Sequence, residues 1–371
     1  MKRVFSIVSA IILLVVALST SEMQAIRTEG FLKRGDPNNT DNTDKIAMAY
    51  VVDRFPNIPD AAMYSHLIYA SALFNDNLDG IVIRYPEKLK AMSELKKQNP
   101  DLKVILCLSD FRRAGFCEMT ADKKKRKAYV KNVYDVIRAY NLDGVDLDWE
   151  FPTTEGGGHT ASPQDDRNYV KLAKDLRRVL GKDAWISYYS NFSGKWIDHK
   201  GMLPYVSYVN VSGYNLAAPR EGEPMLHHSP LYSSPTTGER CIANVIEHHI
   251  DLGIPKEKIL IGIPFFGKGI SPLPMEVGYI DFAKYCSGLR MKWDEDAQAP
   301  FFSDENGNLI LGFDNERSIS AKFDFIRTNQ LPGVFVWCYD FDSIDHKLGR
   351  TIEKLRVGHP AIPSDSLITP K

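Results

Sequence analysis

Eight short apolar runs recur along the chain, and a polar or amphipathic stretch follows each of them. The runs are rich in valine, isoleucine and aromatic residues and are bounded by turn residues, so each predicts a buried strand. The expected strands are Ile46–Val52, His66–Leu73, Lys103–Leu108, Gly144–Glu150, Trp185–Tyr189, Tyr205–Val211, Ile259–Pro264 and Gly333–Tyr339. Eight strands that alternate with helices predict an α/β protein with a (β/α)8 (TIM) barrel. The sequence lacks the GxGxxG turn and the Walker A motif that would favour a doubly wound nucleotide-binding sheet.

Start and stop signals place helices between these strands. Thr120 predicts the N-cap of one helix, and Ser162 followed by proline predicts the start of the next. Gly181 is positioned to end that second helix. A further helix is expected to end at Gly253, and another to span residues 316–329.

The N-terminus has the pattern of a secretory signal. Two basic residues precede an apolar run, and small and polar residues follow it, so residues 1–25 predict a signal peptide. The run is shorter than the roughly 20 apolar residues of a membrane span, so we expect no span after cleavage. Residues 26–44 predict a polar linker, 45–357 the folded domain and 358–371 a C-terminal tail. The expected location is the periplasm, the cell surface or the medium.

Charge and cysteine content exclude several kinds of partner. The 46 lysines and arginines nearly balance the 47 aspartates and glutamates, which gives a net charge of −1 and argues against nucleic acid. The five cysteines show no CxxC spacing, and the adjacent histidines do not form a chelating pattern. We therefore expect no metal and no cofactor, and a monomeric chain.

One predicted strand is too acidic for a barrel core. Side chains on a strand alternate between its faces, so Asp146, Asp148 and Glu150 share one face and an apolar set shares the other. The apolar set should pack under the helices, which leaves three carboxyl groups inside the barrel. Neighbouring carboxylates cannot all stay ionised, so at least one proton is retained, as a general acid requires. Catalytic groups of such barrels lie at the C-terminal ends of the strands, so this pattern predicts an active site.

The segment DGVDLDWEFP, at residues 143–152, resembles the DxxDxDxE signature of glycoside hydrolase family 18, the chitinase family. The resemblance covers the whole domain. KIAMAY is similar to the first strand of the family, NVSGYN to the sixth, ILIGIPFFGKG to the seventh and GVFVWCYDFD to the eighth. The stretch from Tyr279 to Phe313 resembles a shortened α+β insertion between strands seven and eight. The chain is therefore expected to be a secreted member of bacterial type.

The resemblance implies a retaining, substrate-assisted mechanism in which the acetamido oxygen of the substrate is the nucleophile. Glu150 would protonate the leaving oxygen and then act as the base. Asp148 would hold the acetamido nitrogen as the oxazolinium ion forms, and Asp146 would share a proton with Asp148. Tyr214 would donate its hydroxyl to the acetamido oxygen, and Trp337 would form the floor under the −1 sugar.

Further candidate substrate-binding residues are less specific. Asn215, Tyr50 and Phe111 lie at expected strand ends, as do the paired tyrosines at 188 and 189, and each could equally serve packing. Asp143 is also a candidate of this group. However, it lies at the start of the strand and on the opposite face from the three acids, which favours a structural role.

Two segments depart from the family pattern. The third strand ends in Cys107-Leu108-Ser109-Asp110 where the family usually has SxGG, and a thiol is a weaker donor to the lower aspartate than the family serine. The sixth strand carries Ser212-Gly213-Tyr214-Asn215 in place of MxYD. We expect the amide of Asn215 to leave the pKa of Glu150 lower than an aspartate would.

Three functions fit these residues. The first is a chitinase-type hydrolase of β-1,4 linkages next to N-acetylglucosamine, and the insertion favours it because it deepens a cleft for linear chains. The second is an endo-β-N-acetylglucosaminidase that cuts the chitobiose core of N-glycans, which the altered third and sixth strands leave open. The third is a non-catalytic chitinase-like lectin, against which the presence of Glu150 argues.

Overall fold

The computed structural model describes residues 32–39, 41–110, 114–155, 160–218 and 223–358. The unit that begins at Arg34 contains all the strands and helices described below. The predicted signal peptide and most of the predicted tail lie outside the described residues. Within the described ranges, no helix has the length and apolar character needed to cross a bilayer.

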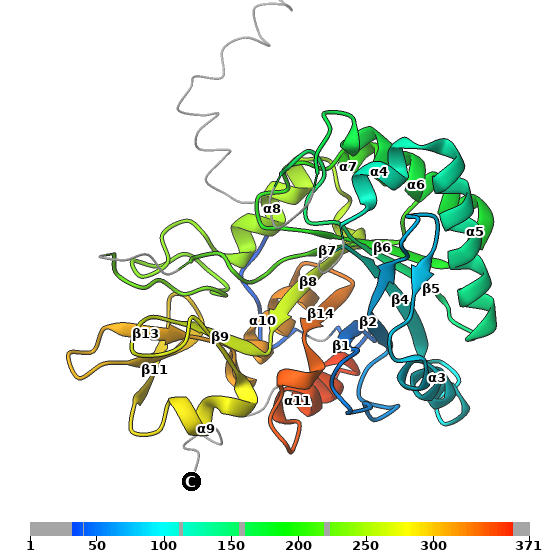
Figure 1. Ribbon diagram of the computed structural model, residues 1–371. Coiled ribbons are helices and arrows are strands. Elements are labelled where there is room, and N and C mark those ends of the chain that lie inside the picture. Colours follow the sequence, from blue (N-terminus) through cyan, green and yellow to red (C-terminus); the bar gives the residue numbers. More distant parts are fainter. Residues whose placement is uncertain (1–31, 40, 111–113, 156–159, 219–222, 359–371) are drawn as a thin grey trace, which may run out of the picture. The chain divides into compact units, whose positions relative to one another are not determined.

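The predicted barrel is confirmed (Figure 1). Its eight strands pair in parallel in the order β1-β2-β4-β5-β6-β7-β8-β14, and pairing of β14 with β1 closes the ring. The strands are β1 (Ile46–Val52), β2 (His66–Phe74), β4 (Lys103–Ser109), β5 (Gly144–Asp148), β6 (Trp185–Ser190), β7 (Tyr208–Val211), β8 (Ile259–Pro264) and β14 (Gly333–Trp337). All eight sequence-predicted strands are present, and their ends shift by at most three residues.

Helices cover the outside of the barrel (Figure 1). They are α3 (Pro86–Glu94), α4 (Phe116–Ala121), α5 (Lys123–Ala139), α6 (Asp165–Leu180), α7 (His199–Met202), α8 (Ile242–Asp251), α10 (Glu316–Thr328) and α11 (Lys347–Arg356). A two-residue strand, β3 (Ile81–Val82), pairs with the end of β2. The short 3-10 turns are η1 (Leu95–Lys97), η2 (Lys256–Lys258), η3 (Tyr279–Asp281) and η4 (Tyr339–Phe341).

Two of the predicted helix starts are wrong. Thr120 is buried inside α4, and Asp122 caps α5 instead, because its carboxylate accepts the backbone N–H groups of Lys124 and Lys125. The helix expected to begin at Ser162 begins at Asp165, where the carboxylate of Asp165 accepts the N–H of Ser162. The predicted ends at Gly181 and Gly253 fit, since both glycines have the positive φ that helix termination favours.

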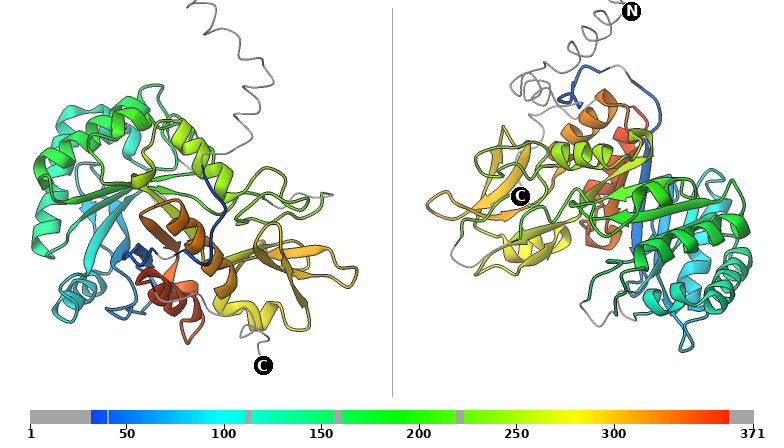
Figure 2. Two further views of the ribbon diagram at one scale, coloured as in Figure 1. Left: turned by 180° about the vertical axis from the view of Figure 1, so that it is seen from behind. Right: turned by 90° about the horizontal axis from the view of Figure 1, so that it is seen from above.

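A small antiparallel sheet stands beside the barrel between β8 and β14 (Figure 2). Its strands are β9 (Phe266–Gly269), β10 (Glu276–Gly278), β11 (Arg290–Asp294), β12 (Ala299–Ser303) and β13 (Leu309–Gly312), with α9 (Phe282–Tyr285) between β10 and β11. Phe282, Phe302 and Phe313 pack together in its own apolar core. The insertion was predicted from Tyr279, but its first strand begins at Phe266.

Residues 34–39 and 41–44, which belong to the segment predicted as a linker, are bound to the barrel. The N–H of Gly35 donates to the hydroxyl of Tyr232 over 2.6 Å. Arg327 Nη1 donates to the carbonyl oxygens of Asp41 and Thr43. This segment therefore reaches β1 along the surface formed by α10 and α11.

Candidate active site

Strand β5 orients the acidic residues as the alternation predicts. Its apolar residues face outward, where Trp149 stacks on Phe116 at 5.2 Å between ring centroids and packs edge-on against Tyr169 at 5.3 Å. The hydroxyl of Tyr169 on α6 donates to the carbonyl of Leu147 over 3.1 Å. These contacts fix the outer face of the strand, so the acidic face points into the barrel.

Asp146 is fully buried at the centre of a hydrogen-bond network. Its Oδ2 accepts the hydroxyl of Tyr50 at 2.7 Å, and its Oδ1 accepts Ser187 Oγ at 2.6 Å and Asn210 Nδ2 at 2.9 Å. The thiol of Cys107 also interacts with this carboxyl. Burial raises the pKa of Asp146, and the donors oppose that rise because they stabilise the ionised form.

Asp148 and Glu150 continue this line of carboxyl groups toward the C-terminal end of the barrel. Burial, followed by the charges of Glu150 and Asp146, raises the pKa of Asp148 well above its usual range. Glu150 is exposed to solvent on one side and surrounded by protein on the other. The loss of hydration, with the charge of Asp110, raises the pKa of Glu150 to about 7. Glu150 can therefore hold a proton near neutral pH, as a general acid must.

Tyr214 and Trp337 complete the group at the barrel mouth. Burial and the neighbouring charges of Glu150 and Asp148 raise the pKa of Tyr214, so its phenol stays protonated and faces these acids. Trp337, at the end of β14, packs on Tyr50 with ring centroids 5.4 Å apart. The structure thus brings together the four predicted catalytic residues, Tyr50 and Trp337.

A buried ion pair supports the segment that carries Tyr214. Lys322 on α10 is fully buried, pairs with Asp314 and donates to Ser229 Oγ at 2.8 Å. The hydroxyl of Ser229 in turn lies 2.8 Å from the carbonyl of Gly213, the residue before Tyr214. Ser212 Oγ donates to the carbonyl of Tyr214 itself at 2.8 Å.

Replacing Lys322 with methionine should destabilise the fold by about 3–5 kcal/mol, because Asp314 would keep a buried charge without its partner. Chemical unfolding at neutral pH measures this change. The same substitution at Lys131, whose pair with Asp135 is exposed, should cost less than about 1 kcal/mol. Equal losses in the two variants would show that the buried pair contributes no more than a surface pair.

The remaining candidates differ in where their side chains lie. Asn215 follows Tyr214 with an exposed side chain and a left-handed backbone (φ 58°). Tyr188 faces outward, where its hydroxyl bonds His199 Nδ1 at 2.7 Å. Tyr189 packs against the apolar cluster inside the barrel, and burial, followed by the charge of Glu150, raises its pKa. Phe111 lies outside the described residues.

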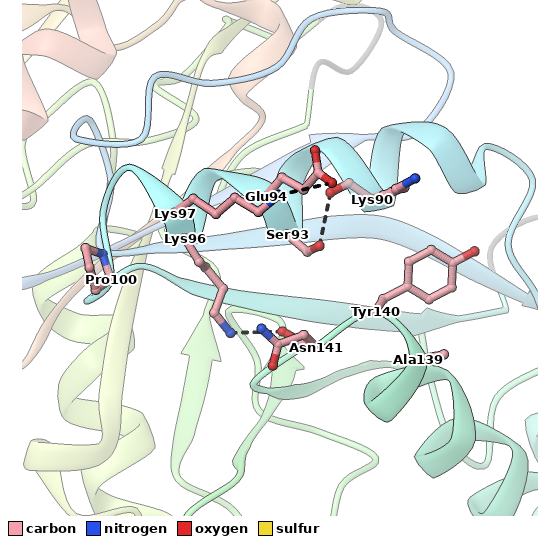
Figure 3. Close-up of a pocket in the computed structure, with 9 residues that line it drawn as sticks. All are labelled: Lys90, Ser93, Glu94, Lys96, Lys97, Pro100, Ala139, Tyr140 and Asn141. Carbon is pink, nitrogen blue, oxygen red and sulfur yellow. Dashed lines mark hydrogen bonds and ion pairs between the residues drawn. The ribbon is translucent and has the colours of Figure 1, made fainter.

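Asp143 lies at the N-terminal end of β5, opposite the three acids. It accepts Lys96 Nζ at 2.9 Å and the N–H of Val104 at 2.8 Å, which ties β5 to β4 and η1. A surface groove opens at this end of the barrel (Figure 3), where Lys96 also reaches the carbonyl of Asn141. The groove is lined by Lys90, Ser93, Glu94, Lys96, Lys97, Pro100, Ala139, Tyr140 and Asn141. None of the three acids lines this groove, so it is separate from the candidate active site.

Two of the donors to Asp146, namely Ser187 and Asn210, were not predicted from the sequence. Each is a polar residue at an inward position of a barrel strand, and this alternation was the available signal. Asp110 was noted only as a substitute for a family glycine, whereas its charge acts on Glu150. Among the described residues, no group of three or more histidine, cysteine or acidic side chains could hold a metal ion.

Comparison with known proteins decides the family. The model of "Glycosyl hydrolases family 18" matches residues 37–342, which is most of the chain. The chain belongs to this family. This family 18 protein is 24% identical over 334 residues to chitinase A1 of Niallia circulans. The match covers 76% of this chain and 48% of that protein. It is 26% identical to probable chitinase 2 of Drosophila melanogaster, covering 80% of this chain and 69% of that one.

A solved family 18 structure agrees with these relatives. The N-acetylglucosaminidase from Paenibacillus barengoltzii superposes with a TM-score of 0.76 at 25% identity, covering 84% of this chain and all of that one. The family match and these relatives identify the protein as a chitinase-like glycosidase. An oviduct-specific glycoprotein of Homo sapiens is also 26% identical, so a relative's name does not by itself define the reaction.

Proposed function

We propose that the protein hydrolyses β-1,4 linkages of N-acetylglucosamine-containing glycans by a retaining, substrate-assisted mechanism. The observation that carries this proposal is the line of Asp146, Asp148 and Glu150 with the protonated phenol of Tyr214 beside it. One acid holds a proton near neutral pH, and a second, more buried carboxyl lies next to it. This is the arrangement that the attack of a neighbouring amide requires.

In the first step, the glycosidic bond breaks while a bond forms between C1 and the acetamido group. Glu150 transfers its proton to the glycosidic oxygen as the bond from that oxygen to C1 breaks. The acetamido carbonyl oxygen of the −1 sugar forms a new bond to C1, which gives an oxazolinium ion. Asp148 passes its proton to Asp146, and the resulting carboxylate stabilises the positive nitrogen of this ion. The hydroxyl of Tyr214 donates to the acetamido oxygen.

The second step regenerates the acid. Glu150, now ionised, accepts a proton from water while the water oxygen attacks C1. The bond between C1 and the acetamido oxygen breaks, and the amide is restored. Two displacements at C1 leave its configuration unchanged, so the initial product should be the β-anomer, which proton NMR measures directly.

A second candidate is an endo-β-N-acetylglucosaminidase that cuts N-glycan cores. The small sheet between β8 and β14 favours the first candidate, because it adds a wall beside the barrel that suits linear chains. We also propose, from the signal pattern at residues 1–25, that the enzyme acts outside the cytoplasm. Product analysis on chitin oligomers, chitin and a glycoprotein separates the candidates. Release of intact N-glycans without cleavage of chitin oligomers would overturn the chitinase assignment.

The rate should decline on the basic side of neutrality. Glu150 must be protonated to act, so kcat/KM should fall as the pH rises above its pKa of about 7. Replacing Asp110 with asparagine removes a negative charge that disfavours ionisation of Glu150. The basic limb of the Asp110→Asn variant should therefore move to lower pH. A limb that stays in place would show that Asp110 does not act on the acid.

A further inference from the structure

The seam between the first and the last strand of the barrel opens toward its mouth. Within these described strands, β1 and β14 pair in register only as far as Ala49 and Val336. Beyond this point β1 continues to Val52 along β2, and β14 continues to Trp337 along β8. The backbone ladder between β1 and β14 therefore ends just before the level at which Tyr50 packs on Trp337.

Two side chains satisfy the backbone of Val52 where the ladder has ended. In a parallel ladder, every second residue directs its backbone groups at the same neighbouring strand. Ile46 donates its N–H to the carbonyl of Pro332, just before β14, so Val52, six residues further on, also directs its groups to that side. The N–H of Val52 donates to Asp340 Oδ2 at 2.7 Å, and its carbonyl accepts Lys88 Nζ at 2.7 Å. These two side chains take the place of the backbone of β14.

The two side chains form a buried pair of opposite charge. Lys88 on α3 is 9% exposed and Asp340 in η4 is 8% exposed, and Lys88 Nζ lies 3.8 Å from Asp340 Oδ1. Lys88 Nζ also donates to the carbonyl of Phe55 at 2.6 Å, and Phe55 packs edge-on against Phe341 of η4. A buried ion pair adds little stability compared with apolar residues of the same size. Its effect here is therefore to fix where α3, the end of β1 and η4 lie relative to one another.

The open part of the seam carries two residues of the candidate active site. The rings of Trp337 and Tyr50 lie 5.4 Å apart across it, and the hydroxyl of Tyr50 donates to Asp146 at 2.7 Å. Asp340 follows Trp337 by three residues, and Val52 follows Tyr50 by two. If the bond between Asp340 and Val52 were lost, the seam could widen and the two rings could move apart.

We propose that Asp340 and Lys88 are positioning residues that hold Trp337 in place under the −1 sugar by tying η4 and α3 to the backbone of Val52. The inference rests on the proposed function. Each of the two side chains acts through the strand end that it holds. When a group orients the substrate, a misplacement of about 1 Å can cost about 10²-fold in rate. Loss of these bonds should therefore lower kcat even where the fold is retained.

The test compares two substitutions of similar size at one position. Asp340→Asn keeps an oxygen that can accept the N–H of Val52, whereas Asp340→Leu has no acceptor. On chitotetraose, Asp340→Leu should lower kcat by about 10- to 100-fold with a smaller change in KM, and Asp340→Asn should keep most of the activity. The control, Asp175→Leu, breaks the pair of Asp175 with Arg126 (3.0 Å), which joins α5 to α6 outside the barrel. It should leave kcat unchanged.

A second readout does not depend on catalysis. The fluorescence emission of Trp337 is isolated as the difference between a protein and the same protein with Trp337→Phe. In Asp340→Leu this emission should shift to longer wavelength, because the ring loses packing on Tyr50 and gains contact with water. An unchanged emission would overturn the inference, whether or not the protein cleaves chitin oligomers.

The outcomes separate this inference from the proposed function. If the parent cleaves chitotetraose and Asp340→Leu has the same kcat, the positioning role is disproved and the function stands. A parent that cleaves no chitin oligomer contradicts the proposed function, and the emission of Trp337 then decides by itself whether the pair holds the ring. Thermal unfolding checks that each variant is folded. If Asp340→Leu is not, the double variant Lys88→Met/Asp340→Leu replaces it with the same expectations, because it leaves no unpaired buried charge.

Discussion

Glu150→Gln should lower kcat on a chito-oligosaccharide by about 10³-fold, with a much smaller change in KM. An amide keeps the size of the side chain, but its N–H protons are too weakly acidic to be transferred to the leaving oxygen. General acid–base catalysis contributes about 10²- to 10⁴-fold in comparable sites. Single-turnover kinetics on chitotetraose measures the loss without interference from product release.

The fold of this variant should be at least as stable as the parent above neutral pH. The pKa of Glu150 is raised in the folded protein, so ionisation of this group favours the unfolded chain as pH rises through about 7. Removing the ionisable group abolishes that destabilisation. Glu257→Gln is the matched control, because Glu257 is exposed in η2 at the N-terminal end of β8. If Glu150→Gln and Glu257→Gln retain equal activity, Glu150 is not the acid.

Asp148→Asn should lower kcat by about 10²- to 10³-fold, a loss typical of removing a group that stabilises developing charge. The oxazolinium nitrogen carries positive charge, which a carboxylate stabilises and a neutral amide does not. The same variant should bind a thiazoline mimic of the cyclised intermediate more weakly than the parent does. Isothermal titration calorimetry measures this affinity, and Asp135→Asn, at an exposed position on α5, serves as the control.

The substrate offers an independent check of the same step. A chito-oligosaccharide whose −1 sugar lacks the 2-acetamido group has no internal nucleophile, so the parent should cleave it at least about 10³-fold more slowly. Under the proposed mechanism, Asp148→Asn should cause little additional loss on this substrate. Comparable cleavage of the two substrates by the parent would mean that an enzyme carboxylate, rather than the amide, attacks C1.

The strands of this protein could be predicted closely because each is an apolar run between turn residues. The alternation within residues 144–150 also gave the direction of the three acids, since the period of a strand is two. The start of α5 was harder to predict, because both Thr120 and Asp122 are residues that favour the N-cap position. Thr120 cannot cap α5 because it lies inside the preceding helix, α4.

The hydrogen-bond partners of Asp146 could not be predicted, because they are far from it in the sequence. Asp146 is separated by 41 residues from Ser187, by 64 from Asn210 and by 96 from Tyr50. Nothing local in the sequence pairs these residues, and only the folded barrel brings their side chains to one carboxyl group. Burial raises the pKa of Glu150 first, and the further rise comes from Asp110, the residue after the neighbouring strand β4.

The network around Asp146 joins β1, β5, β6 and β7 through one carboxyl group. Tyr50 on β1 reaches this carboxyl across the interior of the ring that the pairing of β1 with β14 closes. We therefore expect ring closure and assembly of the catalytic apparatus to coincide during refolding. Recovery of hydrolysis after dilution from denaturant should report the moment at which the ring closes, independently of when helical structure returns.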